Sequence, residues 1–115
     1  MKKIPFVLTM IIIISIAACT KKASPGKTTM KSTTYTTDMV PLLQAKCSPC
    51  HLPSKGGRKA DFENYANAKK YGADMLARVM LNPTDRGFMP FKHDKLPAEE
   101  IAIIKNWVDQ GMPEN

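Results

Sequence analysis

The sequence predicts a small all-α domain, and three observations support this fold class. A length of 115 residues suits a single domain. Residues 38–47 and 96–111 each place apolar side chains at the spacing of one helical face. The βαβ pattern of a parallel sheet is absent, and a hydrophobic fraction of 43% excludes a wholly disordered chain.

Apolar and charged residues are both unevenly distributed. Residues 4–18 form one apolar run, and the remainder is a polar domain with few aliphatic side chains. Such a domain usually needs disulfides, a metal or a cofactor to be stable. The formal net charge is +7, but from residue 32 onward eleven Lys and Arg stand against ten Asp and Glu, a net charge of +1. We therefore expect no nucleic-acid partner.

Residues 1–18 have the features of a secretory signal peptide. Two lysines precede an apolar core of about 15 residues, which is short of the roughly 20 that a membrane-spanning helix needs. The ending IAAC resembles the lipobox of bacterial lipoproteins, in which the cysteine is lipidated on sulfur and becomes the new N-terminus. This resemblance implies a lipid anchor on Cys19. The alternatives are an uncleaved anchor and ordinary cleavage after Ala18.

Residues 19–35 comprise this cysteine and a tether rich in Thr, Lys and Ser. A coil of about 17 residues has an end-to-end distance of roughly 20–25 Å, which keeps a domain close to the membrane. We therefore expect a signal peptide over 1–18, a tether over 19–35 and one domain over 36–115. The domain is expected on the periplasmic side of a bacterial membrane.

The first helix of this domain is expected over residues 38–47. Val40, Leu43 and Cys47 fall on one helical face, and Asp38 and Pro41 suit a first turn. This helix ends at the chemically most informative motif of the chain.

Cys47-Ser48-Pro49-Cys50-His51 has the C-x-x-C-H pattern of c-type haem attachment. Two thiols at this spacing at the end of a helix can reach the two vinyl groups of one porphyrin and form thioethers. The next residue then lies beneath the ring, where an imidazole can bind iron. The motif predicts one covalently attached haem c, held by Cys47 and Cys50, with His51 as the proximal iron ligand.

Three other uses of the motif fit less well. A redox-active dithiol usually accompanies a βαβ pattern. A zinc site would need His51 and His93, with Cys50 and His51 adjacent on one ion and without the usual spacing. A disulfide would be strained and would close a very short loop. Lipid on Cys19 and haem on Cys47 and Cys50 account for all three cysteines of the chain.

Three further helical segments follow. Residues 61–70 and 72–81 each fit a short helix, the second with Leu76, Val79 and Met80 on one face. The last helix opens at residues 96–97, with a proline and two acidic residues near its start, and ends at a glycine. Its expected buried stripe is Ile101, Ile104, Trp107 and Val108, and its end is Gly111.

From about residue 36 to residue 111 the chain resembles a small class I cytochrome c domain. In that family a first helix leads into C-x-x-C-H, an axial methionine follows in a loop, and a last helix packs across the first. The pattern I-K-x-W-V-D-x-G over residues 104–111 is typical of the family. The resemblance implies a cytochrome c fold, with the N- and C-terminal helices packed across each other around one haem.

Met89 is the expected distal iron ligand. It lies in a loop over residues 86–91, where Gly87 permits an unusual backbone and Pro90 restricts Met89 to an extended conformation. Such a loop can present a thioether to iron, and members of the family typically carry Met-Pro at this place.

Other ligand sets remain open. His93 would give a bis-histidine centre of lower potential, and Met80 or an open site are further alternatives. Met75 and Met80 both lie on a helical pattern, which favours a packing role for them.

The sequence thus predicts an electron-transfer protein rather than an enzyme. With both axial positions filled, iron has no place for a substrate, and no second cluster of histidine and acidic residues suggests acid–base catalysis. We expect a monomeric, membrane-anchored monohaem cytochrome c that passes single electrons between respiratory redox partners. The alternatives are a haem-based sensor of small ligands and a haem subunit of a larger oxidoreductase.

Overall fold

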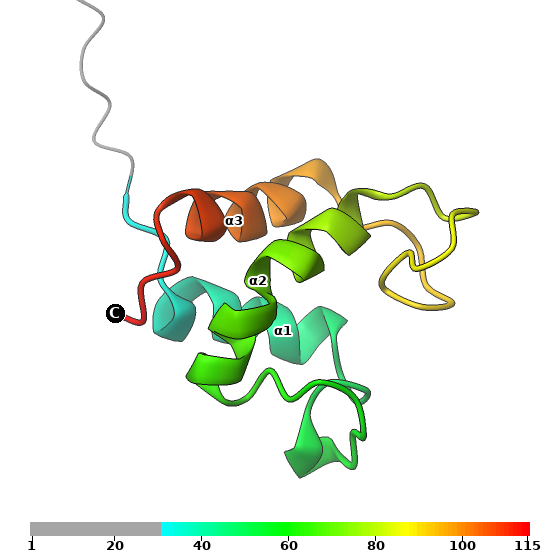
Figure 1. The fold of residues 1–115 in the computed structure, drawn as a ribbon, viewed down its shortest axis with the longest axis horizontal. Coiled ribbons are helices and arrows are strands. Elements are labelled where there is room, and N and C mark those ends of the chain that lie inside the picture. The colour runs from blue at the N-terminus through cyan, green and yellow to red at the C-terminus, as the bar shows by residue number, and fades with distance from the viewer. Residues whose placement is uncertain (1–30) are drawn as a thin grey trace, which may run out of the picture.

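Three helices make up the part of the chain that the computed structural model describes, residues 31–115 (Figure 1). They are α1 (Val40–Lys46), α2 (Tyr65–Met80) and α3 (Ala98–Asp109). These residues contain no strand, which confirms the all-α prediction. They also contain no helix long and apolar enough to cross a membrane. The predicted signal peptide and Cys19 lie outside the described residues.

The first helical segment begins earlier than predicted. A π-helical turn, η1 (Tyr35–Met39), leads directly into α1. Thr34 caps this turn, because its side-chain oxygen accepts a hydrogen bond from the Thr37 amide at 3.2 Å. In return the Asp38 carboxylate accepts from the Thr34 amide at 2.9 Å. The two bonds satisfy amides that the start of a helix leaves without a partner.

The predicted buried face of this segment was partly wrong. Leu43 is buried, but Val40 and Cys47 are only half-buried. Met39 and Leu42, which the predicted stripe left out, are buried instead, and Met39 is completely inaccessible. Met39, Leu42 and Leu43 recur at the i, i+3, i+4 spacing of one helical face, so the sequence allowed this stripe as well as the predicted one, and tertiary packing selects between them.

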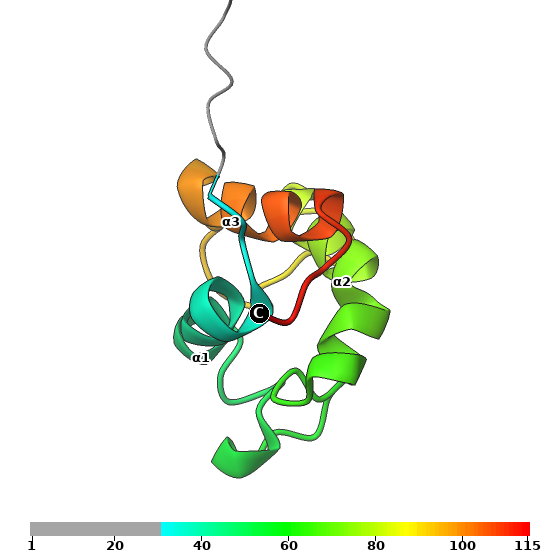
Figure 2. The same ribbon diagram turned by 90° about the vertical axis from the view of Figure 1, so that its left-hand side faces the viewer.

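Residues 33–35, assigned to the tether from the sequence, are buried against the C-terminal end of the chain (Figures 1 and 2). The Tyr35 amide donates to the Pro113 carbonyl at 2.9 Å. The Thr33 amide donates to the Gln110 side-chain oxygen, also at 2.9 Å. The packed domain therefore begins near Thr33, three residues before the predicted boundary at 36.

A single helix, α2, replaces the two short helices expected between residues 61 and 81. It passes through Gly72 without a break because this glycine permits close contact with the C-terminal region. A Cβ atom at Gly72 would lie 2.5 Å from the sulfur of Met112 and 3.1 Å from the Trp107 ring. Residues 61–64 stay outside the helix, and the Asn64 side chain caps it.

The expected face of Leu76, Val79 and Met80 was also partly wrong. Val79 is buried, Leu76 is half-buried, and Met80 is 54% exposed. The buried residues of α2 recur at helical spacing along a different stripe, formed by Ala68, Gly72, Met75 and Val79.

The last helix was predicted well. Ile104 and Trp107 of α3 are buried, and Ile101 and Val108 are half-buried. Gly111 has a φ of +82°, and its amide donates to the Val108 carbonyl at 3.0 Å. The next amide donates to the Trp107 carbonyl at 2.8 Å, which completes a Schellman cap.

The packing of α3 centres on Trp107, which is fully buried. Its indole nitrogen donates to the Pro113 carbonyl at 2.9 Å, and its ring lies 6.2 Å from that of Tyr35. The first helical segment thus meets α3 mainly through η1. At its other end, an ion pair at 3.1 Å joins Lys46 to Glu100.

Candidate cofactor site

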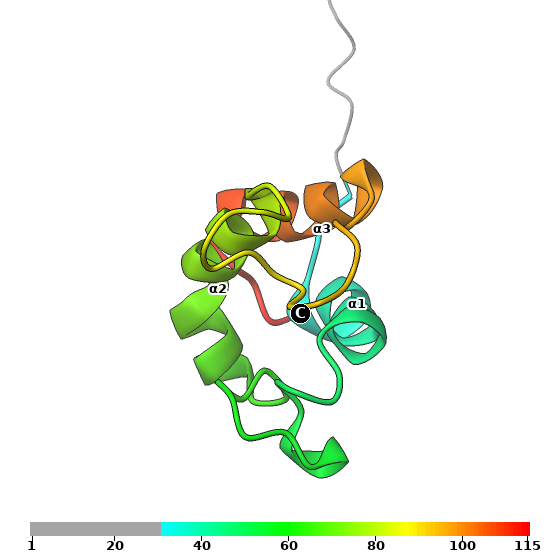
Figure 3. The same ribbon diagram turned by 90° about the vertical axis from the view of Figure 1, so that its right-hand side faces the viewer.

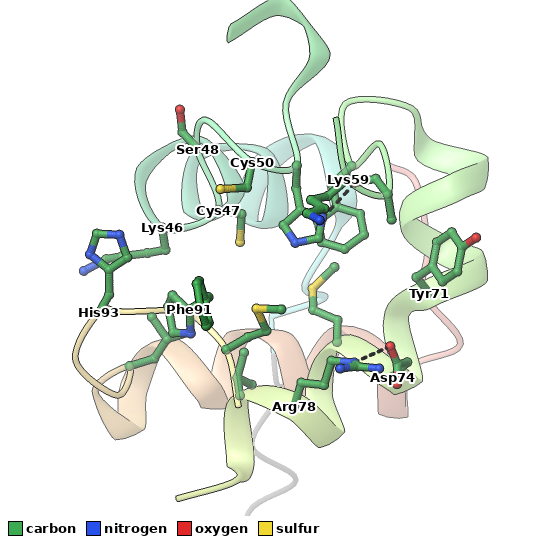
Figure 4. A pocket seen from close by; sticks show the side chains of 18 residues that line it. Lys46, Cys47, Ser48, Cys50, Lys59, Tyr71, Asp74, Arg78, Phe91 and His93 are labelled. Atoms are coloured by element: carbon green, nitrogen blue, oxygen red, sulfur yellow. Dashed lines mark hydrogen bonds and ion pairs between the residues drawn. The ribbon is translucent and has the colours of Figure 1, made fainter. Parts of the chain in front are cut away.

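A cavity of about 490 Å³ lies between the end of α1, the side of α2 and the loop over residues 81–97 (Figure 4). Figure 3 shows the arrangement of these three segments of the backbone. Its volume falls within the roughly 300–1,000 Å³ that is usual for small-molecule and cofactor sites. Cys47, Cys50, His51 and Met89 all line this cavity. The fold thus brings the predicted haem-binding residues and the predicted distal ligand to one place.

The C-x-x-C-H segment continues directly from α1. The His51 amide donates to the Cys47 carbonyl at 3.0 Å, which is the bonding pattern of an α-helical turn. Cys47 is half-buried and Cys50 is exposed. Figure 4 shows the two cysteines close together on the α1 side of the cavity. Both thiols therefore belong to one hydrogen-bonded turn.

The loop after the motif packs tightly on it. A Cβ atom at Gly57 would lie 2.2 Å from the Pro49 carbonyl oxygen and 2.7 Å from that of Cys50, so only glycine fits. The Lys59 amide donates to the Cys50 carbonyl at 3.0 Å. Gly57 was not singled out from the sequence, although its place in a Gly-Gly pair just after the motif was a visible signal.

His51 is held by two contacts that sequence reasoning missed. Its Nδ1 lies 2.8 Å from the Ala60 carbonyl oxygen, and its ring stacks on Phe62 at 4.2 Å and an interplanar angle of 3°. Because a carbonyl oxygen only accepts, Nδ1 is the donor, and in the neutral imidazole Nε2 then has a free lone pair. Histidine ligands of metals are usually fixed in this way. His51 is therefore prepared to bind a metal through Nε2.

Cys47 by itself is not an activated thiol. Burial raises the pKa of the Cys47 thiol to about 11. This thiol is therefore protonated at neutral pH, whereas thiol–disulfide chemistry depends on a thiolate. Cys47 and Cys50 are both free, with no disulfide between them.

The zinc alternative finds no support in the described part of the chain. Among residues 31–115, no group of three or more His, Cys, Asp or Glu side chains is gathered so that it could hold a metal ion. Structural zinc sites need four such ligands in a tetrahedral arrangement.

Met89 lies on the loop side of the cavity and is half-buried. Gly87 has a φ of +94°, the unusual backbone that was predicted there. His93 and Met75 also line the cavity, whereas Met80 does not. The structure therefore disfavours Met80 as a distal ligand and leaves His93 as an alternative to Met89.

The walls of the cavity are mostly apolar, and its charged residues lie toward the edges. Phe62, Val79 and Leu96 are buried residues of the wall. Figure 4 shows Lys46 and His93 at one end, and Lys59, Tyr71, Asp74 and Arg78 toward the other. An apolar interior with few polar groups suits a large, flat and mainly apolar ligand.

Comparisons with protein-family models, with curated proteins and with solved structures find no match to this chain. The interpretation of the site therefore depends on its own residues and their geometry.

Proposed function

We propose that this protein is a one-electron carrier with a cytochrome c fold that binds one haem c covalently. The observation that carries the proposal is the common position of Cys47, Cys50, His51 and Met89 on one cavity. Met89 comes from a loop far along the chain from the C-x-x-C-H motif. Nothing in the motif requires a methionine beside the cavity, so the position of Met89 supports the proposal independently of the motif.

Each of these residues has a definite role in the proposal. Cys47 and Cys50 would hold the haem through two thioethers, and one hydrogen-bonded turn carries both thiols. His51 binds iron through Nε2, with the Ala60 carbonyl holding its ring. Met89 provides a thioether sulfur as the distal ligand.

The ligand pair decides the chemistry. When bound, haem supplies an iron that gains or loses one electron. His51 and Met89 would both hold the iron and leave no open position for a substrate, so transfer of an electron is the activity that fits. The thioether of Met89 is a soft, neutral ligand that favours the reduced metal. We therefore expect a higher reduction potential than a second imidazole from His93 would produce.

Haem attachment is tested by producing the full chain together with a haem-maturation system. We expect the intact mass to increase by one haem, and the haem to stay with the polypeptide on a denaturing gel. The matched control is the double variant Cys47→Ser/Cys50→Ser, which should lose both properties. A wild-type chain that matures without added mass would contradict the proposal.

The ligands are tested by the absorption spectrum of the oxidised protein. Methionine-ligated ferric haem has a weak far-red band that bis-histidine haem lacks. We expect this band in the wild type and its loss in Met89→Ala. If the spectrum does not respond to Met89→Ala but changes in His93→Ala, the iron ligand is His93 and not Met89.

We also propose that lipid on Cys19 anchors the domain to a bacterial membrane on the periplasmic side, where it meets protein redox partners. The support is the lipobox-like IAAC sequence, which lies outside the described residues. Mass spectrometry of the mature N-terminus should find a lipidated Cys19, and Cys19→Ser should abolish lipidation while the haem domain remains intact. An unmodified N-terminus would contradict the anchor.

A further inference from the structure

We propose that Arg78 is a positioning residue that holds Met89 in place for iron, an inference that rests on the proposed function. Arg78 belongs to the last turn of α2 and lines the cavity. Its guanidinium Nη1 donates to the Gly87 carbonyl at 3.4 Å. Its own carbonyl accepts from the Met89 amide at 3.3 Å. One residue of a helix thus contacts both ends of the tripeptide 87–89.

These two bonds are the hydrogen bonds that join residues 86–91 to a helix within the described range 31–115. The ring of Phe88 is also buried, and the Met89 side chain packs against the hydrophobic core. Residues 82–86 and 91–95 on either side are exposed. The position of the Met89 side chain therefore depends on a short stretch of chain with few attachments.

Gly87 has the conformation that the contact with Arg78 requires. Its φ of +94° lies in the left-handed region, which glycine adopts without a steric penalty. A Cβ atom at this position would lie 3.2 Å from Nη1 of Arg78. The absence of a side chain thus lets the guanidinium reach the carbonyl of residue 87.

Asp74 orients the guanidinium. Its carboxylate accepts from Nε of Arg78 at 2.7 Å, one helical turn earlier on α2 (Figure 4). Both side chains are about half exposed, so the ion pair contributes little to stability by itself. Its effect is to restrict the rotamers of Arg78 and direct Nη1 toward the loop. Asp74 thus contacts Arg78, and Arg78 contacts the loop at Gly87 and at Met89, the proposed iron ligand.

The test compares Arg78→Met with Arg86→Met in the ferric holoprotein. Both variants remove one positive charge near the same loop, but Arg86 is exposed and has no side-chain hydrogen bond to the described residues. Added imidazole displaces a methionine ligand, and the far-red band reports the displacement. We expect Arg78→Met to reach half-displacement at about a tenfold lower imidazole concentration than the wild type. Arg86→Met should stay within about twofold of the wild type.

Two further variants act on the same contact. Asp74→Asn should also lower the imidazole concentration at half-displacement (the midpoint), but by a smaller factor, because the guanidinium remains and is less well oriented. Gly87→Ala keeps Arg78 and strains the loop at a positive φ, so it should also lower the midpoint. If Arg78→Met does not retain haem, Asp74→Asn decides the matter, and an unchanged midpoint in that variant overturns the inference.

The outcomes separate this inference from the proposed function. If Met89→Ala abolishes the far-red band but Arg78→Met and Arg86→Met behave alike, Met89 is the ligand and Arg78 does not position it. If the wild-type ferric protein lacks the band, the proposed ligation and the inference are both wrong.

Discussion

The region around Trp107 and the region around Met89 differ in how firmly the chain is held. Trp107 is fully buried, its indole donates to the Pro113 carbonyl at 2.9 Å, and the capped end of α3 covers it. The loop that carries Met89 is exposed over residues 91–95, and Phe91 within it is 66% exposed. Most of the buried contacts therefore lie around Trp107, and the proposed methionine ligand lies where the chain has few of them.

The two proposed iron ligands fall on opposite sides of this division. His51 belongs to a turn continuous with α1, and its ring is fixed by the Ala60 carbonyl and by stacking on Phe62. Met89 depends on the few contacts of its loop. Regions with few buried contacts are the ones that open most easily in a folded protein. We therefore expect His51 to stay bound under conditions in which Met89 is displaced.

The largest expected effect is the loss of haem, which tests whether the Trp107 region can fold alone. Cys47→Ala/Cys50→Ala could not hold the proposed haem covalently, and we expect the remaining core to be too small to offset the chain entropy of folding. We expect a largely unfolded chain by far-UV circular dichroism, whereas Cys19→Ser should retain full helicity. A haem-free chain with native helicity and cooperative thermal unfolding would show that the helices suffice without haem.

The second effect compares an aromatic residue from each region. Trp107→Ala should lower the free energy of unfolding of the holoprotein by about 3–5 kcal/mol, as is usual for a fully buried aromatic. Phe91→Ala should change it by less than about 0.5 kcal/mol, because most of its ring is already in water. Denaturant titrations of both variants measure the difference. Equal losses would contradict the division between the regions.

The third effect separates an electron carrier from a sensor. Met89→Ala should open the distal site and give high-spin iron that binds carbon monoxide readily, while Met89→His should stay low-spin with a lower potential. Met80→Ala is the matched control, since Met80 is 54% exposed and does not line the cavity. Rapid and tight binding of carbon monoxide by the reduced wild type would favour the sensor function instead.

The smallest effect concerns the pH dependence of stability. Tyr35 donates its hydroxyl to the Phe62 carbonyl at 2.7 Å, and burial, together with nearby Asp61 and Glu63, raises its pKa above 10.0. The folded state therefore keeps this proton to a higher pH than the unfolded chain does. The contribution of Tyr35 is fully present below about pH 10 and is lost as the pH rises through the folded-state pKa.

Tyr35→Phe should lower the free energy of unfolding by about 1 kcal/mol near neutral pH, the usual value of one hydrogen bond. The variant should also lack the part of the stability loss at alkaline pH that comes from Tyr35. Denaturation at a series of pH values checks both expectations. A difference between wild type and variant that does not change above pH 10 would refute the assigned role of Tyr35.

The helices and the candidate site differ in how far the sequence predicted them. The last helix was anticipated nearly to its ends, because its apolar stripe and terminal glycine are local signals. The buried stripes of the other helices were partly wrong. Met39 and Gly72 are buried through contacts with distant segments, which local periodicity does not contain.

The sequence by itself determined the C-x-x-C-H motif, the methionine loop and the all-α class, since spacing and composition carry these features directly. Only the tertiary structure decided that Met89 reaches the same cavity as His51, and that Met80 does not. It also decided which carbonyl fixes His51 and which arginine contacts the loop. Each of these two contacts joins residues nine positions apart, and the partners are selected by the packing of a loop rather than by the spacing of a regular helix.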